Sequence, residues 1–433
     1  MTRYLTAQTE YEVRPRRIAG SRDEKLEQID AAIQELIDIK TLECADGNPH
    51  VRFLAVPRPR SHAFAMIVAI LVLLIALVML MGVRSAGAQT VGAFVDVGYL
   101  KDFNSPGNHL FRTRGTTPRV DELDVNMAAA FLKKAPTPAS RWGLELTAQG
   151  GHDSDLFGFS PTAPNLKSGE WLRRVGPTNV SYLAPVGRGL TIQGGIFNSL
   201  IGYDSLYAKD NFTYTRPWGA DFTPYLMLGA NATYPVSDRL SVTGFVVNGY
   251  FHLAHANDAP SIGGQAVYAL TPHVSLKEVA LYGSHQADTA LSHWRSLSDT
   301  ILERKAGALT TAVELQLATE RVAESGERAS WISAQFPVHV AVSGPWSVTV
   351  RPEFARDQSG RYTSVRQTVG AITSTLEYRK AVPGAQAILR LEYRYDNSRG
   401  TEGGFFTGAD NALTPGQPLL IGGIILTFEH SQK

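Results

Sequence analysis

The sequence predicts an all-β fold, a closed antiparallel transmembrane β-barrel of about 16 strands (roughly 14 to 18), preceded by a signal or anchor helix. Three observations support this prediction. From Gln89 onward the chain is a succession of short segments rich in Val, Thr, Tyr, Leu and Ala, with alternating polarity. The polar faces of these segments carry charged residues, and the connections between them alternate between short and long.

The N-terminal part of the chain differs from the rest. Residues 63–88 hold an uncharged apolar run from Ala63 to Val83, followed by small residues up to Ala88, which is the order of a secretory signal cleaved after Ala88. An uncleaved anchor is the alternative, because about 20 apolar residues span a bilayer. Export signals begin at the N-terminus, so we interpret residues 1–62 as an over-extended start or a short amphipathic helix. Residues 89–433 then form the barrel.

Composition excludes several classes of function. The only cysteine, Cys44, precedes the predicted barrel, so the exported part has no disulfide scaffold, cysteine nucleophile or thiolate metal site. The 41 basic and 40 acidic side chains leave a formal net charge of +1, which provides no electrostatic reason to expect nucleic acid as a partner. The sequence lacks a glycine-rich phosphate loop and a nucleophile elbow. We therefore expect no cofactor.

About sixteen segments are predicted as strands, because each alternates in polarity between turn residues. Two of them, 178–185 and 296–303, are weaker, and without them the barrel would have about fourteen strands and a narrower pore. Strands can cross a membrane only in a closed barrel, where every backbone group is paired. The segments are 90–100, 119–132, 140–150, 178–185, 189–198, 223–234, 239–249, 260–270, 273–282, 296–303, 308–320, 329–341, 345–356, 366–380, 384–396 and 417–429.

The alternation is clearest near the C-terminus. In segment 384–396, Leu389 and Leu391 lie on one face, and Arg390 and Glu392 lie on the other. A strand of a soluble sandwich has the same period, but its polar face seldom carries so many charges. In a large barrel the apolar face contacts lipid and the charged face lines a watery lumen.

The connections between segments alternate in length along the chain. Residues 186–188 and Thr271-Pro272 are short turns, whereas 151–177 and 199–222 are long loops. Transmembrane barrels have short turns on the periplasmic rim and long loops outside. Both ends of the barrel segment are therefore expected on the periplasmic side.

Four short motifs in the chain are characteristic of one family. They are Gly195-Ile196-Phe197, Ile201-Gly202-Tyr203-Asp204, Asn211-Phe212-Thr213-Tyr214-Thr215-Arg216 and Val247-Asn248-Gly249. In these motifs, and over most of the chain from about Gln89 to the end, the sequence resembles the putative beta-barrel porin-2 family, the OmpL-like outer-membrane porins. Two departures are the long N-terminal extension and the residues after Phe428, which make the C-terminal assembly signal internal.

The loop 199–222 is the candidate functional site. By resemblance to general porins, a loop at this place can fold into the lumen, where opposite charges across a constriction orient dipolar solutes. The alternative is that these charges only pair with one another; we predict that Arg216→Ala or Arg390→Ala changes conductance or ion preference in planar bilayers. The loop candidates are Asp204, Lys209, Asp210, Arg216 and Asp221, and the wall candidates are Arg351, Glu353, Arg390, Glu392 and Arg394.

These observations predict an outer-membrane porin for passive diffusion of small hydrophilic solutes or ions, and not an enzyme. A barrel plugged by its own loops for a structural or surface-binding role is the alternative, and a barrel enzyme using Ser284, His285 and His293 is a third hypothesis. His252 and His255 are interpreted as solvated loop residues, so no metal site is predicted. The predicted partners are outer-membrane lipid, the solutes or ions, the barrel-assembly machinery and, by resemblance to general porins, further copies in a homotrimer.

Overall fold

The barrel is described by a computed structural model that covers residues 89–156, 169–249, 259–284, 293–322, 325–361 and 363–432. The predicted N-terminal extension (1–62) and signal segment (63–88) lie outside the described residues. Within the described ranges, no helix is both long and apolar enough to cross a membrane.

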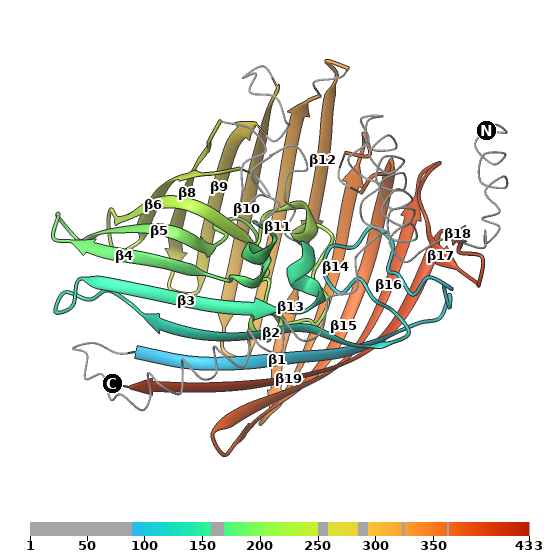
Figure 1. Ribbon diagram of the computed structural model, residues 1–433, viewed down its shortest axis with the longest axis horizontal. Coiled ribbons are helices and arrows are strands. Elements are labelled where there is room, and N and C mark those ends of the chain that lie inside the picture. The colour runs from blue at the N-terminus through green and yellow to red at the C-terminus, as the bar shows by residue number, and fades with distance from the viewer. Residues whose placement is uncertain are drawn as a thin grey trace, which may run out of the picture. The chain divides into compact units, whose positions relative to one another are not determined.

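The strands form one continuous antiparallel sheet that closes on itself (Figure 1). They are β1 (Gln89–Asp102), β2 (Leu123–Lys134), β3 (Trp142–Gly150), β4 (Thr178–Ala184), β5 (Leu190–Asn198), β6 (Leu226–Pro235), β7 (Leu240–Val247), β8 (Ser261–Thr271), β9 (Val274–Ser284), β10 (Trp294–Ala306), β11 (Leu309–Arg321), β12 (Arg328–Gln335), β13 (Val338–Ser343), β14 (Trp346–Asp357), β15 (Gln367–Val382), β16 (Ala385–Arg399) and β19 (Gly416–Gln432). Each strand pairs with its neighbours in sequence, and β1 closes the barrel by pairing with β19 from Gln89↔Gln432 to Asp102↔Leu419.

The barrel has sixteen strands, which confirms the predicted closed antiparallel β-barrel, whereas the predicted helix before it lies outside the described residues. The sheet contains 17 strand segments, but β12 and β13 both pair with β11 and β14 and are successive parts of one strand. The prediction of one unbroken strand over 329–341 is wrong in this detail, because Pro337 has no N–H to donate to the ladder. Both weaker segments, 178–185 and 296–303, correspond to real strands, β4 and β10.

The connections contain elements that the sequence did not predict. A small hairpin of β17 (Phe405–Thr407) and β18 (Ala412–Thr414) lies between β16 and β19. Short 3₁₀ helices are η2 (His152–Leu156), η3 (Gly169–Arg174), η4 (Ala208–Asp210) and η5 (Ala220–Phe222). Elements this short carry too little periodicity to be recognised from sequence.

Side chains alternate between the two sides of the wall, most regularly along β14 and β16. Along β14, Trp346, Val350 and Phe354 are exposed on the outer side, whereas Arg351 and Glu353 are buried inside the barrel. The outer face therefore has the apolar surface that lipid requires. The prediction that the inward charges line a watery lumen is incomplete, because at this level they are covered by a loop that enters the barrel.

Candidate functional site

Residues 199–225, the connection between β5 and β6, form an inner loop that lies inside the barrel. Its main chain is bound by inward-facing side chains from widely separated strands. Gly202 N–H donates to Asp299 of β10 (2.7 Å), and Tyr214 N–H donates to Glu392 of β16 (2.6 Å). Because strands from several sectors of the wall bind the loop, these contacts fix its path across the lumen.

Strand β16 supplies three side chains that bind the loop backbone. Glu392 accepts the N–H groups of Tyr214 (2.6 Å) and Thr215 (3.1 Å). Arg390 donates to the carbonyl oxygens of Ala208 (2.7 Å), Asn211 and Thr213 (2.9 Å), and it also pairs with Glu377 of β15 (2.8 Å). Arg394 donates to the carbonyl oxygen of Arg216 (3.1 Å). All three side chains are buried, so these charge-assisted hydrogen bonds are strong.

Strand β14 holds the next part of the loop. Glu353 accepts the N–H of Trp218 (2.5 Å) and pairs with Arg394 (2.9 Å). Arg351 donates to the hydroxyl of Thr213 and lies 4.0 Å from the carboxylate of Asp204. The predicted wall residues thus contact the predicted loop, mostly through its backbone and seldom through its charges.

Another sector of the wall, β9 to β11, contains binding residues that the sequence analysis missed. Lys277 of β9 donates to the carbonyl oxygen of Gly202 (2.8 Å), and Glu314 of β11 accepts the N–H of Tyr203 (2.9 Å). Both side chains face inward at alternating positions of their strands, as Asp299 does on β10. This alternation was the signal in the sequence that could have identified them. Sequence alone does not single them out among many inward polar residues.

Two loop candidates, Arg216 and Asp221, face other connections. The buried guanidinium of Arg216 lies 3.1 Å from the carboxylate of Asp153 in η2. Asp221 pairs with Arg114 of the β1–β2 connection (3.0 Å), and Arg114 also donates to the carbonyl oxygen of Arg216 (2.7 Å). These ion pairs therefore join the inner loop to the β1–β2 and β3–β4 connections. The sequence analysis had instead predicted that Arg216 and Asp221 line an open constriction.

Burial raises the pKa of Asp153 from 3.8 to about 7, although Arg216 acts in the opposite direction. A pKa raised on folding contributes stability that is complete below the ordinary pKa and is lost as pH rises to about 7. A shift of this size corresponds to at most about 4 kcal/mol. We expect the free energy of unfolding of the full chain, relative to Asp153→Asn, to fall as pH rises from about 4 to 7.

This pH dependence is measured by denaturant unfolding in detergent at several pH values. Asp238→Asn, at a side chain that is 89% exposed, is the matched control and should leave the pH dependence unchanged. Equal slopes for the native chain and Asp153→Asn would contradict the assignment.

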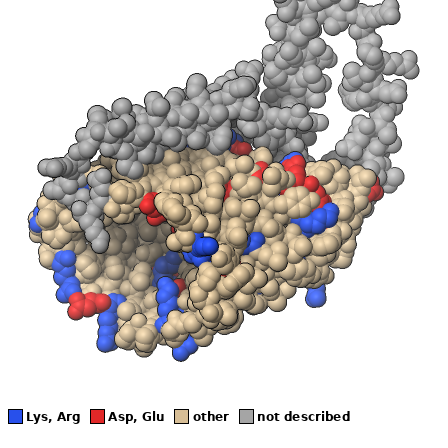
Figure 2. Space-filling model, turned by 90° about the horizontal axis from the view of Figure 1, so that it is seen from below, with Lys and Arg blue, Asp and Glu red and all other residues tan. Residues whose placement is uncertain are grey.

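Lys209 and Asp210 lie in η4 beside a small hollow near the short-turn end of β1 and β2. Lys209 Nζ is 2.8 Å from the Asp210 carboxylate and 3.6 Å from that of Glu429. Phe94 and Phe131 also line this hollow, together with Lys133, Thr147, Asn198, Ser205 and Tyr207. Figure 2 shows the barrel hollowed on the face in view, with Lys and Arg side chains along the edge.

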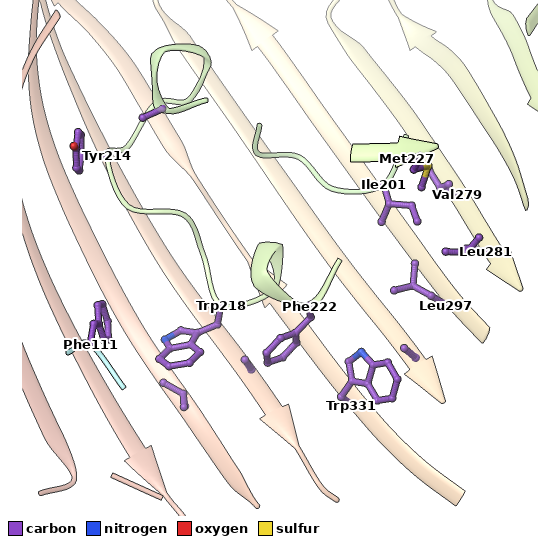
Figure 3. Packing of buried hydrophobic residues seen from close by; sticks show 14 of the residues in the cluster. Phe111, Ile201, Tyr214, Trp218, Phe222, Met227, Val279, Leu281, Leu297 and Trp331 are labelled. Atoms are coloured by element: carbon purple, nitrogen blue, oxygen red, sulfur yellow. The ribbon is translucent and has the colours of Figure 1, made fainter. Parts of the chain in front are cut away.

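The inner loop also packs through an apolar cluster (Figure 3). Trp218 and Phe222 point from the loop toward the wall, and the Trp218 ring makes an edge contact with Phe111 (6.1 Å between centroids). Trp331 of β12 belongs to the same cluster. Apolar burial therefore adds to the hydrogen bonds that hold the loop.

Tyr214 fits against two wall glycines. A Cβ on Gly98 would lie 2.3 Å from the Tyr214 hydroxyl, and a Cβ on Gly423 would lie 2.4 Å from its ring. The hydroxyl donates to Asp96 (2.6 Å). These contacts require glycine at both positions, because any larger side chain would displace the ring.

We expect Gly423→Val to expel Tyr214 and destabilise the barrel by about 1–3 kcal/mol, the usual cost of overpacking. Denaturant unfolding measures the effect. Gly422→Val is the control, because the neighbouring Gly422 has nothing within 4 Å of a built Cβ. Equal losses of stability in both variants would show that Tyr214 does not pack against Gly423.

A ladder of uncharged polar side chains runs across β4 to β7. Gln193 donates to Asn179 (2.8 Å), Asn231 donates to Gln193 (2.9 Å), and the hydroxyls of Thr233 and Thr243 are 2.9 Å apart. This part of the inward surface of β4 to β7 is polar and neutral. Nearer the inner loop the same strands are apolar inside, because Phe197, Met227 and Phe245 belong to the cluster that includes Trp218.

The structure brings all ten candidate residues to the interior, but their role in ion flow stays a prediction. Among the described residues, no cluster of three or more His, Cys, Asp or Glu could hold a metal ion. His252, His255 and His285 lie outside the described residues. The structure therefore provides no distance that would test the hypothesis of a Ser284-His285 catalytic pair.

Comparison with known proteins identifies one family and several similar folds. The sequence profile described as putative beta-barrel porin-2, OmpL-like matches residues 89–428, and no curated protein matches. The chain is similar to the outer membrane channel DcaP of Acinetobacter baumannii (TM-score 0.50, 8% identity, covering 80% of this chain and 99% of that one). It is also similar to an anion-selective porin from Comamonas acidovorans (TM-score 0.50, 11% identity, covering 79% of this chain and 100% of that one). A third similar structure is OmpT, an outer membrane protein of Vibrio cholerae (TM-score 0.49, 11% identity, covering 80% of this chain and 99% of that one).

Proposed function

Because the chain belongs to the putative beta-barrel porin-2, OmpL-like family, we propose that it carries small hydrophilic solutes passively across the outer membrane. The observation that carries this proposal is the closed sixteen-stranded barrel, which is apolar outside and polar inside. About sixteen strands enclose a lumen wide enough for an aqueous channel. The chain is thus an outer-membrane β-barrel porin, and its solute is the open question.

The uncharged ladder on β4 to β7 supports neutral polar solutes. Amide and hydroxyl groups offer both donors and acceptors to a sugar-sized molecule. The charges at the level of the inner loop are already paired with the loop or with one another. A path along Gln193 and Asn231 would therefore select weakly among ions.

A second candidate is a barrel closed by its own inner loop. The buried side chains of Arg390 and Arg394 favour this candidate, since they donate to carbonyl oxygens of the loop and hold it on the wall. Transport would then require the loop to move. Conductance recording separates the two candidates.

Several further expectations remain proposals. Cleavage of a signal after Ala88, folding by the barrel-assembly machinery and assembly as a homotrimer follow from the sequence and the resemblance. The family and the fold of this chain are typical of channels. We propose that the chain has no catalytic activity.

The test is liposome swelling with neutral sugars of graded size, together with planar-bilayer conductance, on the full chain. We expect swelling that falls with sugar size and stable open channels with little ion preference. Asn231→Asp should raise cation preference, whereas Asp238→Asn at the exposed turn should not. A folded protein with neither swelling nor conductance would exclude an open pore and leave the loop-closed barrel.

A further inference from the structure

Three exposed arginines form a cluster on the outer wall, at the end of the barrel that carries the long connections. Arg356 is the last outward residue of β14, and Arg399 is the last of β16. Both lie opposite Thr368 of β15, the strand between them (Figure 1), so their backbones are about 10 Å apart. Arg366 directly precedes β15 and is also exposed. The three positive charges therefore lie on adjacent parts of one rim.

The chain itself does not neutralise this arginine cluster. On the inward side of β16, Arg390 and Arg394 are paired with carboxylates. In the described part of the chain, the three outward guanidinium groups have no such ion pair and no side-chain hydrogen bond. The carboxylate of Glu402 accepts the backbone N–H of Arg366 (3.1 Å), and one carboxylate leaves an excess of positive charge. Each guanidinium group therefore keeps its N–H donors for a ligand.

The outer wall has a shallow depression directly below the cluster. Gly370 is the next outward residue of β15 after Thr368, and it lies between Phe354 of β14 and Asn397 of β16. A Cβ on Gly370 would meet nothing within 4 Å. The aromatic rings of Phe354 (41% exposed) and Tyr395 (39% exposed) flank it. Aromatic residues of a barrel wall gather at the membrane interface, so the arginines lie at the level of the lipid headgroups.

We propose that the arginine cluster binds a membrane lipid whose headgroup carries a phosphate monoester, with an acyl chain of that lipid over Gly370. Guanidinium groups bind phosphate oxygens through paired, charge-assisted hydrogen bonds. A phosphate monoester carries about −1.5 to −2 charges at neutral pH, whereas a phosphate diester carries one. Three arginines facing a single carboxylate match the monoester better. The depression at Gly370 then receives the apolar part of the same molecule.

This lipid site depends on the membrane location of the barrel and not on the proposed transport. Arg356 and Arg399 face away from the lumen, so their replacement should leave single-channel conductance unchanged. Failure of lipid binding would leave the channel proposal standing, and absence of conductance would leave the lipid site standing.

The experiment titrates the full chain, purified in a neutral maltoside detergent, with diphosphoryl lipid A and measures bound lipid by native mass spectrometry. The test variant combines Arg356→Gln, Arg366→Gln and Arg399→Gln, which remove the charges and keep polar side chains. We expect it to bind this lipid about tenfold more weakly or worse, because each lost guanidinium removes charge-assisted hydrogen bonds. Circular dichroism verifies that every variant folds.

The matched control removes three exposed cations at the short-turn end of the barrel. It combines Arg239→Gln, Arg304→Gln and Lys380→Gln. This control should bind the lipid as tightly as the native chain does. Equal losses in the two triple variants would show a response to net charge alone and would overturn the proposal.

Other ligands test the chemistry of the headgroup. Lipid A without phosphates, and phosphatidylglycerol with its phosphate diester, should both bind about tenfold more weakly or worse. Equal binding of either lipid would overturn the proposal, as would displacement of diphosphoryl lipid A by equimolar inorganic phosphate. Gly370→Trp should weaken lipid binding by filling the depression, whereas Gly422→Trp on β19, also with nothing within 4 Å of a built Cβ, should not. Equal effects of these two variants would contradict the placement of the acyl chain.

Discussion

Replacing Arg390 with alanine is expected to raise the single-channel conductance by about twofold or more, because the inner loop narrows the lumen. The Arg390 guanidinium binds the carbonyl oxygens of three loop residues, Ala208, Asn211 and Thr213. Without these bonds, the loop segment around η4 loses its attachment to β16. Planar-bilayer recording should show larger and noisier openings.

Arg379→Ala provides the matched control for this effect. Arg379 pairs with the same carboxylate, Glu377 (2.9 Å), but its other hydrogen bond in the described structure goes to Gln386 of the wall. Its removal takes away a similar charge without releasing the loop. If Arg379→Ala raises conductance as much as Arg390→Ala, the effect comes from charge and not from the loop.

Replacing Arg394 with alanine is expected to lower the free energy of unfolding by about 3–5 kcal/mol, the cost of breaking a buried ion pair from one side. Arg394 is fully buried and lies 2.9 Å from Glu353 and 2.8 Å from Asp396. Its loss leaves both carboxylates without this counter-charge. Denaturant unfolding in detergent measures the change.

Two further variants identify the cause of that loss. Arg356→Ala, on the outer side of β14, should change the free energy of unfolding by less than about 0.5 kcal/mol, as exposed sites do. Adding Asp396→Asn to Arg394→Ala should restore part of the stability, because it removes one of the two stranded charges. A loss for Arg394→Ala no larger than that for Arg356→Ala would contradict the buried network.

The barrel could be predicted from the sequence because each strand repeats the same constraint. A strand with lipid on one side and polar surroundings on the other must alternate, as β14 and β16 do. Even the two weaker segments, which correspond to β4 and β10, retained enough of this alternation to be predicted as strands. The break at Pro337 could have been predicted from its missing N–H, whereas the three-residue strands β17 and β18 lie below the length at which a pattern can be read.

The candidate site could be predicted in part. Charged residues of the loop and of β14 and β16 were identifiable, but not their partners, because Arg390 and Glu392 bind loop backbone that has no sequence signature. Lys277 and Glu314 look like other inward polar residues until the loop meets them. The requirement for glycine at Gly423 depends on where Tyr214 lies, which is a tertiary contact.

Buried side chains fix the inner loop inside the barrel. Hydrogen–deuterium exchange of the loop's backbone amides in the full chain tests this most directly. The N–H groups of Tyr214, Thr215 and Trp218, which belong to no strand, are bound by Glu392 and Glu353. We expect these amides to exchange as slowly as the amides of β14 and β16. Exchange as fast as in an exposed turn would contradict it.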